Sequence, residues 1–390
     1  MLVDLEKYKC CGCSACAEIC TRGCITMEPD GEGFLYPIKK IEKCITCGLC
    51  EKVCPERNMF EKKTPIHVYA AQNLNDVVRG KSSSGGIFYL LAQRIFLDKG
   101  VVFGVRFNEK LKAVFDYAEN VQELDCLLGS KYVQAQVGDA YKKVKCFLRD
   151  GRWVMFSGTP CQIAGLKRYL QKDYERLLTV DIACHGVPSP KVWDKYVGEL
   201  QKKRGKIERV DFRSKKMGWK HFMFSIIYRK KNNFKQVSTP FWNNLYMRTF
   251  LSDIILRPSC YHCMFKDGKS NSDITIGDYW GIKYVKPNMD DNKGTSIIIV
   301  NTEKGYKSLE FNKMSTEETT YSQGCAMNPA LVSSSIQPLK RKEFFYKMDK
   351  SRSIIELMEE NLQGSLKEQL KRRLKLFKLY MTHLLKTIKS

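Results

Sequence analysis

The first 54 residues contain one cysteine pattern twice. CxxCxxCxxxC begins at Cys10 and again at Cys44. Three thiols at intervals of three residues can wrap one four-iron four-sulfur cubane from a tight loop, while the fourth points toward the neighbouring cluster. The two ligand sets are therefore expected to interlock. The first cluster would take Cys10, Cys13, Cys16 and Cys54, and the second would take Cys44, Cys47, Cys50 and Cys20.

The doubled spacing leaves little room for other interpretations. Structural zinc sites usually pair CxxC elements across a longer gap, so zinc is the weaker interpretation here. The second motif ends in Cys54-Pro55 but the first ends in Cys20-Thr21, which loosens the turn without removing a ligand. Cys11 and Cys24 lie outside the pattern. We expect them to be small buried residues or exposed thiols, with a role in an altered cluster as the alternative.

Residue composition and patterning divide the chain into three parts: a cysteine-dense part over 1–62, a body over 63–335 and a basic helical tail over 336–390. The body alternates β-rich runs with helical stretches, which is typical of an α/β domain containing parallel strands. The expected strands lie at 67–72, 100–107, 152–158, 177–184 and 295–301, and the expected helices at 87–100 and 162–171. The predicted fold is thus an α+β ferredoxin-like two-cluster domain, an α/β flavoprotein domain with a mixed sheet, and a helical C-terminal tail.

Four later cysteines stand in settings that favour a further metal site. Cys161 and Cys184 each follow an expected strand, and the carboxyl ends of such strands are where ligands collect in an open α/β sheet. The pair Cys260 and Cys263 can complete a four-thiolate set from a separate loop. From spacing alone, an iron-sulfur cluster, zinc and buried cysteines without a ligand role all remain open.

Five strings of the body resemble the beta subunit of the deazaflavin-coenzyme-reducing hydrogenases and dehydrogenases, a family that includes plant hydroxymethyl chlorophyll a reductase. They are RGKSSSGGIF, GSKYVQ, FSGTPCQIAGL, DIACHGVPS and CYHCMFKDGKSNSDITIGDYWG, in that order between about residues 65 and 300. Members of this family bind FAD beside an iron-sulfur cluster. The resemblance implies that Cys161, Cys184, Cys260 and Cys263 hold a third 4Fe-4S cluster.

The flavin would be held by small residues that precede an apolar helix. Backbone amides at a helix N-terminus can bind a pyrophosphate, although an ordinary flexible loop is the alternative for such a string. The segment consists of Lys81, Ser82, Ser83, Ser84, Gly85 and Gly86. Lys131, Tyr132 and Gln134 are candidates to face the ring or its phosphates. His185, Asp278 and Trp280 are candidates to shape the substrate site, with structural packing as the alternative. His262, between Cys260 and Cys263, is as readily an exposed spacer.

The sequence opens MLVDLEKYKCC, with acids and bases interleaved and no apolar core of a signal peptide, so we expect a cytoplasmic protein. The formal net charge is +24, but a cluster with four thiolates carries about −2. Nucleic acid is not expected as the main partner, because net charge alone also suits acidic proteins or anionic lipid. Residues 366–388 predict a basic amphipathic helix begun by a capping box at Ser365 and Glu368. It suits docking on the body or peripheral contact with the inner face of a membrane.

The predicted function is that of an iron-sulfur flavoprotein oxidoreductase. Electrons would come from a redox partner protein or ferredoxin, pass through the clusters to FAD and reach a small-molecule acceptor by hydride transfer. The alternative is a non-catalytic electron-carrier subunit for a partner enzyme. Bacterial proteins that the chain resembles are associated with surface polysaccharide synthesis, which implies a sugar-linked substrate.

Overall fold

The computed structural model describes residues 5–231 and 233–362, and it divides the chain into two compact units. The first unit is made of residues 1–191 and 256–336, and the second of residues 192–255 and 337–390. The second unit is therefore built from an insertion and the C-terminal segment. The boundaries predicted at 62/63 and 335/336 stay a prediction.

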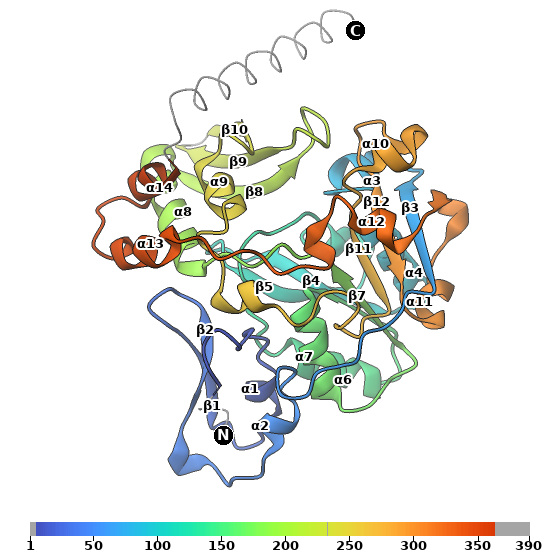
Figure 1. The fold of residues 1–390 in the computed structure, drawn as a ribbon, viewed down its shortest axis with the longest axis horizontal. Helices are drawn as coiled ribbons and strands as arrows, with labels where there is room; N and C mark the ends of the chain where they lie inside the picture. Colours follow the sequence, from blue (N-terminus) through green and yellow to red (C-terminus); the bar gives the residue numbers. More distant parts are fainter. Residues whose placement is uncertain (1–4, 232, 363–390) are drawn as a thin grey trace, which may run out of the picture. The chain divides into compact units, whose positions relative to one another are not determined.

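The N-terminal part of the first unit repeats its backbone as well as its sequence (Figure 1). The third cysteine of each motif lies in a short helix, Cys16 in α1 (Ala15–Ile19) and Cys50 in α2 (Leu49–Lys52). The residue before each helix is left-handed, with φ of 64° at Ser14 and 71° at Gly48. Between them lie the antiparallel strands β1 (Ile25–Pro29) and β2 (Leu35–Lys39), and the 3-10 turn η2 (Ile41–Lys43).

The centre of the first unit is an eight-stranded mixed sheet in the order β13-β3-β12-β11-β7-β6-β4-β5. Strands β4, β6, β7 and β11 run parallel, and the outer pairings are antiparallel. The strands are β3 (His67–Asn73), β4 (Val101–Phe107), β5 (Ala113–Ala118), β6 (Val154–Gly158), β7 (Leu177–Ile182), β11 (Ile274–Asp278), β12 (Ser296–Val300) and β13 (Met314–Glu318). The mixed sheet predicted for this part of the chain is confirmed.

Helices cover both faces of this sheet, and alternate residues of its strands feed two cores. On one face Phe103 and Phe156 pack with α6 (Ala140–Arg149) and α7 (Pro160–Leu170), and Cys11 and Cys13 belong to the same core. The opposite face packs against α4 (Ile87–Leu97). The remaining helices of this unit are α3 (Asp76–Lys81), α5 (Val121–Leu124), η3 (Pro258–His262), α10 (Ile282–Val285), η4 (Pro287–Met289), α11 (Glu303–Lys307), η5 (Phe311–Lys313), α12 (Tyr321–Cys325) and η6 (Pro329–Leu331).

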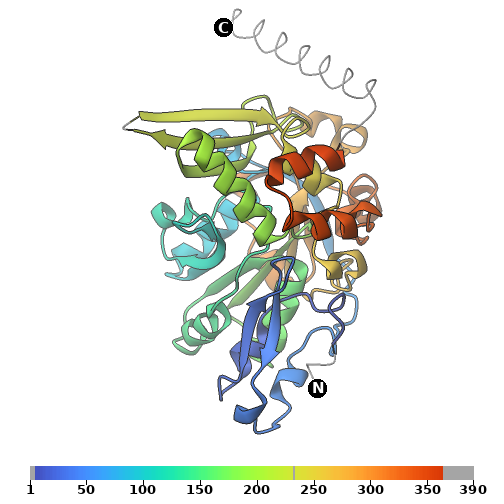
Figure 2. The ribbon, with the colours of Figure 1, turned by 90° about the vertical axis from the view of Figure 1, so that its left-hand side faces the viewer.

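The second unit has its own aromatic core. Its antiparallel sheet has the order β10-β9-β8, and helix α8 (Pro190–Arg204) lies along it (Figure 2). Trp193 and Tyr196 of α8 contact Phe212, Phe224 and Tyr246. The other elements are β8 (Lys206–Ser214), β9 (Met223–Lys230), β10 (Asn233–Pro240), α9 (Leu245–Leu251), α13 (Lys340–Met348) and α14 (Ile354–Leu362).

The described part of the tail is helical, as predicted, with a break between α13 and α14. The predicted basic helix over 366–388, with its capping box, lies outside the described residues. Over residues 5–231 and 233–362, no helix is long and apolar enough to cross a membrane.

Candidate iron-sulfur and flavin site

The predicted ligands of the first cluster line one cavity. Cys10, Cys13, Cys16 and Cys54 surround a space of about 340 Å³ that opens to solvent. Burial is the main reason why the pKa of the Cys16 thiol lies well above its usual value, and the Cys10 and Cys54 sulfurs add to it. A buried thiol that resists ionisation releases its proton to solvent when iron binds, because the metal cation stabilises the thiolate in place of water. The cavity therefore fits a thiolate-bound cluster.

The second motif lies mostly at the surface. Cys44 and Cys50 are partly buried, whereas Cys47 is exposed. The backbone N–H of Thr46 donates to the Cys44 sulfur at 3.3 Å, and this bond, followed by one from Lys39, lowers the pKa of Cys44. Both contacts favour a thiolate and so suit a metal ligand.

The four cysteines predicted for a third cluster come together in the first unit. Burial raises the pKa of Cys260 to about 12 and that of Cys263 to about 11, and the Cys161 sulfur adds to both shifts. Cys184 is coupled electrostatically to all three other thiols. Within the described residues, no group of three or more histidine, cysteine or carboxylate side chains closes on the position of a single metal ion.

Local geometry explains where two of these thiols stand. Parallel strands β6 and β7 end side by side, since Gly158 pairs with Asp181, and so Cys161 and Cys184 follow at the same sheet edge. Pro160 begins α7, and a capping box of Thr159 and Gln162 fixes its first turn. The Thr159 hydroxyl lies 3.2 Å from the Cys161 sulfur.

Cys11 joins the first cysteine set to the third. Its side chain lies within hydrogen-bonding reach of both Cys13 and Cys161. The Cys13 contact and burial hold the pKa of Cys11 well above the ordinary thiol value, although the Cys161 contact acts in the opposite direction. Cys11 is 8% exposed, in agreement with the expectation of a small buried residue. The same position in the second motif is Ile45, which is 59% exposed.

A buried arginine ties the first motif to the body. Arg257 is 0% exposed and donates to the Cys10 carbonyl at 2.8 Å, to the Leu35 carbonyl at 2.9 Å and to Gln134 Oε1 at 3.1 Å. Its guanidinium lies 4.2 Å from the centre of the Tyr36 ring. A buried cation beside two cysteine sets favours the more negative, reduced state of nearby clusters.

The serine-glycine segment lies between α3 and α4, and its hydroxyls are engaged within the protein. Ser84 donates to the Thr295 carbonyl at 3.0 Å, and Ser82 donates to the Val78 carbonyl at 2.8 Å. Each glycine also has a packing reason. A Cβ at Gly85 would stand 2.4 Å from the Ala71 carbonyl oxygen, and Gly86, with φ of 85°, is the left-handed residue that starts α4.

Two of the segments predicted to bind flavin lie together. Ser83 Oγ accepts from the backbone N–H of Ser130 at 2.9 Å, so residues 82–86 and 129–132 are neighbours. The segments share the sheet edge of the cysteines, because the Gly85 N–H donates to Ser296 and Ser296 pairs with Asp278 at the carboxyl end of β11.

Lys131 and Gln134 face different partners. Lys131 Nζ donates to the Leu128 carbonyl at 2.7 Å and to the Cys126 carbonyl at 3.1 Å. Gln134 is buried, and its amide donates to the Cys11 carbonyl at 3.4 Å and accepts from Arg257. Tyr132 is partly buried, between them in the chain. The segment 131–134 thus runs from the serine-glycine loop to Cys11, the residue that contacts both the first and the third cysteine sets.

The other candidate residues have contacts elsewhere in the first unit. The His185 carbonyl accepts from Ser335, and the Asp278 carbonyl accepts from Asn328. The His262 ring packs edge-on against Tyr8 at 5.3 Å. Trp280 is partly buried just after β11.

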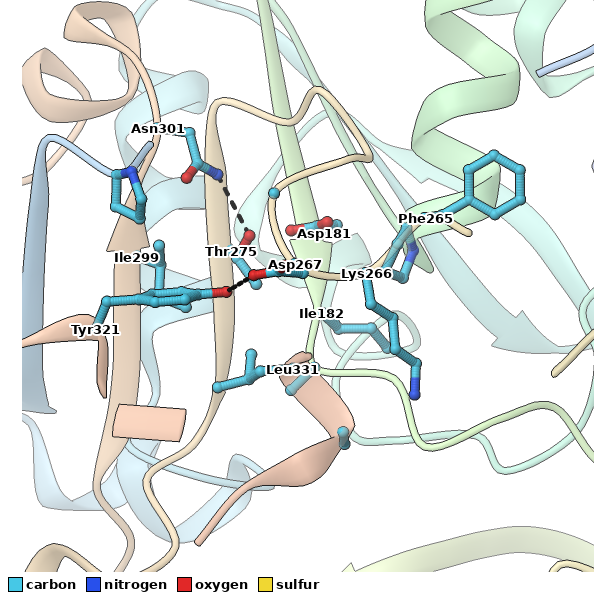
Figure 3. Close-up of a pocket in the computed structure, with 15 residues that line it drawn as sticks. Asp181, Ile182, Phe265, Lys266, Asp267, Thr275, Ile299, Asn301, Tyr321 and Leu331 are labelled. Carbon is cyan, nitrogen blue, oxygen red and sulfur yellow. Dashed lines mark hydrogen bonds between the residues drawn. The ribbon is translucent and has the colours of Figure 1, made fainter. Parts of the chain in front are cut away.

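A polar cavity of about 360 Å³ adjoins the third cysteine set through Pro160 and Ala183 (Figure 3). Burial raises the pKa of its buried carboxyl, Asp181, to about 6. Tyr321 donates to Asp267 at 2.8 Å across the cavity. Sequence inspection did not select these residues, because an aspartate within a β-rich run carries no motif.

The sequence also did not predict two residues that connect the N-terminal part to the body, Glu18 and Arg257. Glu18 of α1 accepts from the Lys142 N–H at 2.9 Å at the start of α6, and burial raises its pKa to about 7. Arg257 follows a segment without a recognisable motif. Only the three-dimensional neighbourhood reveals either role, because their partners lie more than a hundred residues away in the chain.

Two protein-family models match the chain. Residues 9–58 match the model of the 4Fe-4S dicluster domain, and residues 151–322 match the model that describes the C terminus of the coenzyme F420 hydrogenase/dehydrogenase beta subunit. The chain is thus an iron-sulfur electron-transfer protein. Residues 151–322 thus carry the region that this beta subunit model describes, and the resemblance seen in the sequence is confirmed there.

Several solved chains are similar to this protein. Among them is a chain of the F420-reducing [NiFe] hydrogenase complex from Methanosarcina barkeri, with a TM-score of 0.44 and 15% sequence identity, and the match covers 66% of this chain and 83% of that chain. No curated protein matches the chain.

Proposed function

We propose that this protein is an iron-sulfur flavoprotein oxidoreductase. Electrons enter through the N-terminal 4Fe-4S clusters, pass a third cluster held by Cys161, Cys184, Cys260 and Cys263, and reach FAD. A small-molecule acceptor then takes a hydride. When bound, FAD supplies the conversion between one-electron and two-electron chemistry.

The observation that carries this proposal is the contact of Cys11 with both Cys13 and Cys161. Cys13 lines the cavity of the first set, and Cys161 belongs to the third. Electron transfer between two clusters requires that their ligands lie close together. Helix α7 can approach Cys13 closely because residue 165 is glycine. A Cβ there would lie 2.8 Å from the Cys13 Cβ.

The flavin side of the proposal rests on the placement of two segments. Residues 82–86 and 129–132 share the sheet edge from which Cys161 and Cys184 project. The Ser82 and Ser84 hydroxyls already donate to protein carbonyls, and Ser83 Oγ accepts from Ser130. We therefore assign the pyrophosphate to the backbone amides at the start of α4 and the ammonium of Lys81. Lys131 and Tyr132 stand next to them.

A redox partner protein would exchange electrons at the second motif. Its loop is exposed from Ile45 to Gly48, whereas the corresponding residues of the first motif are buried. Basic side chains close to it, including Lys39 and Lys52, suit an acidic partner. The relation to a hydrogenase subunit agrees with a partner of this kind.

Cofactor content tests the proposal most directly. Protein purified without oxygen and supplied with iron, sulfide and FAD is expected to hold about twelve irons and one FAD per chain, at four irons per cubane. Cys161→Ala and Cys184→Ala should each lose about four irons and slow the reduction of bound flavin at least tenfold. Cys146→Ala, at an exposed cysteine, serves as the matched control.

Two outcomes would contradict this assignment. Cofactor-replete protein without flavin, and without flavin binding in a titration, would leave an electron carrier. Full iron content in both variants would remove the third cluster. Stoichiometric oxidation of the bound flavin by a sugar-linked acceptor would support the substrate class that the sequence resemblance implies.

A further inference from the structure

A fifth thiol stands at the predicted second cluster. The sulfur of Cys24 lies 3.2 Å from the sulfur of Cys20, the residue expected to supply the fourth ligand. Cys24 is 3% exposed and packs in one group with Cys20, Cys44 and Cys50. Its side chain also lies within hydrogen-bonding reach of the Cys44 sulfur.

The backbone fixes Cys24 in this place. Its carbonyl accepts from the Lys40 N–H at 2.8 Å, which extends the β1–β2 ladder by one step beyond the pair Ile25 and Lys39. The turn η2 then carries the chain to Cys44. The position of Cys24 beside the second motif therefore follows from strand pairing.

Cys20 is held less firmly. It caps α1 and is only partly buried, and the next residue is Thr21 instead of the proline that ends the second motif. Its carbonyl accepts from Gly23 in a turn that brings Cys24 back toward it. The two thiols thus occupy the two ends of one short turn.

We propose that Cys20 and Cys24 are interchangeable fourth ligands of the second 4Fe-4S cluster. Either thiolate completes the set formed by Cys44, Cys47 and Cys50. On exchange, one iron–sulfur bond breaks and another forms, and the proton of the incoming thiol passes to the sulfur that leaves. The inference rests on the cluster-binding assignment of residues 9–58 and is independent of flavin and substrate.

Single and double variants separate this proposal from ordinary ligation. In anaerobically reconstituted full-length protein, Cys20→Ala and Cys24→Ala should each keep the iron and acid-labile sulfide of the parent. Cys20→Ala should also shift the electron paramagnetic resonance signal of the reduced second cluster. The double variant should lose about four irons, the content of one cubane.

Cys54→Ala is the matched control, because Cys54 corresponds to Cys20 in the second motif and the residue four positions later is Asn58. This variant should lose about four irons. Retention of all iron by Cys54→Ala would refute the cluster assignment itself. Loss of the second cluster in Cys20→Ala alone, or its retention in the double variant, would overturn the interchange while leaving that assignment intact. Circular dichroism checks that each variant is folded.

Discussion

The two cysteine motifs have the same spacing and closely similar backbones, but they have opposite surroundings. In the first, Cys11, Gly12, Cys13 and Ser14 are buried, while in the second the corresponding Ile45, Thr46, Cys47 and Gly48 are exposed. Both third positions are left-handed, with φ of 71° at Gly12 and 51° at Thr46.

The difference lies in what each loop must approach. A Cβ at position 12 would stand 2.8 Å from the Gln134 amide nitrogen, so the first motif requires glycine where the second accepts threonine. The first motif has become part of the core of the body, and the second remains available to another protein. A duplicated sequence thus yields an inner and an outer redox position.

Removal of the buried Arg257 cation should produce the largest difference in stability between the first and the second cluster. Arg257→Met leaves the Cys10 and Leu35 carbonyls and Gln134 Oε1 without their donor, at a cost of about 1–3 kcal/mol for each unsatisfied acceptor. We expect the first cluster to be lost before the second during anaerobic thermal unfolding, followed by visible absorbance and electron paramagnetic resonance. Arg57→Met, at an exposed arginine beside the second motif, should change stability by less than about 0.5 kcal/mol. Equal effects of the two variants would argue against the comparison.

Acidity should reveal how the first motif is attached. The pKa of Glu18 is raised from 4.5 to about 7 by burial, so the folded protein retains a proton that the unfolded chain has released. The contribution of protonated Glu18 to the free energy of unfolding is fully present below about pH 4.5. It is lost as the pH rises through 7, and the total loss is about 3 kcal/mol. Urea unfolding between pH 5 and 8 should show that Glu18→Gln gains stability relative to the parent as pH rises. If the amides of Tyr141 and Lys142 instead stabilised a carboxylate, the variant would be the weaker protein at pH 8.

The smallest effect concerns the helix on which the first motif rests. Gly165→Ala places a Cβ 2.8 Å from Cys13 Cβ and 3.0 Å from its sulfur, and such overpacking costs about 1–3 kcal/mol. Gly198→Ala, also within a helix, meets nothing within 4 Å and should stabilise the protein by about 0.5–1 kcal/mol through helix propensity. Thermal midpoints and iron content measure both, and an iron-replete, stabilised Gly165→Ala would contradict the close approach.

Much of the architecture was accessible from the sequence. The β-rich runs at 67–72, 100–107, 152–158, 177–184 and 295–301 all form strands. Strands in the middle of a sheet that is covered on both faces read as largely apolar segments, whether they pair in parallel, as β4, β6 and β7 do, or antiparallel, as β3 and β12 do. The helices at 87–100 and 162–171 are likewise confirmed as α4 and α7. The second compact unit was not anticipated, since local patterns do not say that residues 192–255 fold with the C-terminal segment.

The candidate site was likewise predictable only in part. Spacing predicted which thiols act together, because ligand geometry is local to each motif. It gave no signal for the contact of Cys11 with Cys161 or of Cys24 with Cys20, in which the partner is chosen by packing and strand register. The roles of the serine-glycine segment, Lys131, Tyr132 and Gln134 toward a flavin stay a prediction.

The insertion of residues 192–255 separates Cys184 from Cys260 and Cys263 along the chain. During synthesis, both N-terminal motifs leave the ribosome roughly two hundred residues before the last of these thiols. The N-terminal clusters can therefore be loaded on a nascent chain. The four thiols of the proposed third cluster can come together only after residues 192–255 and the Cys260–Cys263 segment have been translated. The third cluster would therefore be assembled after the two N-terminal clusters.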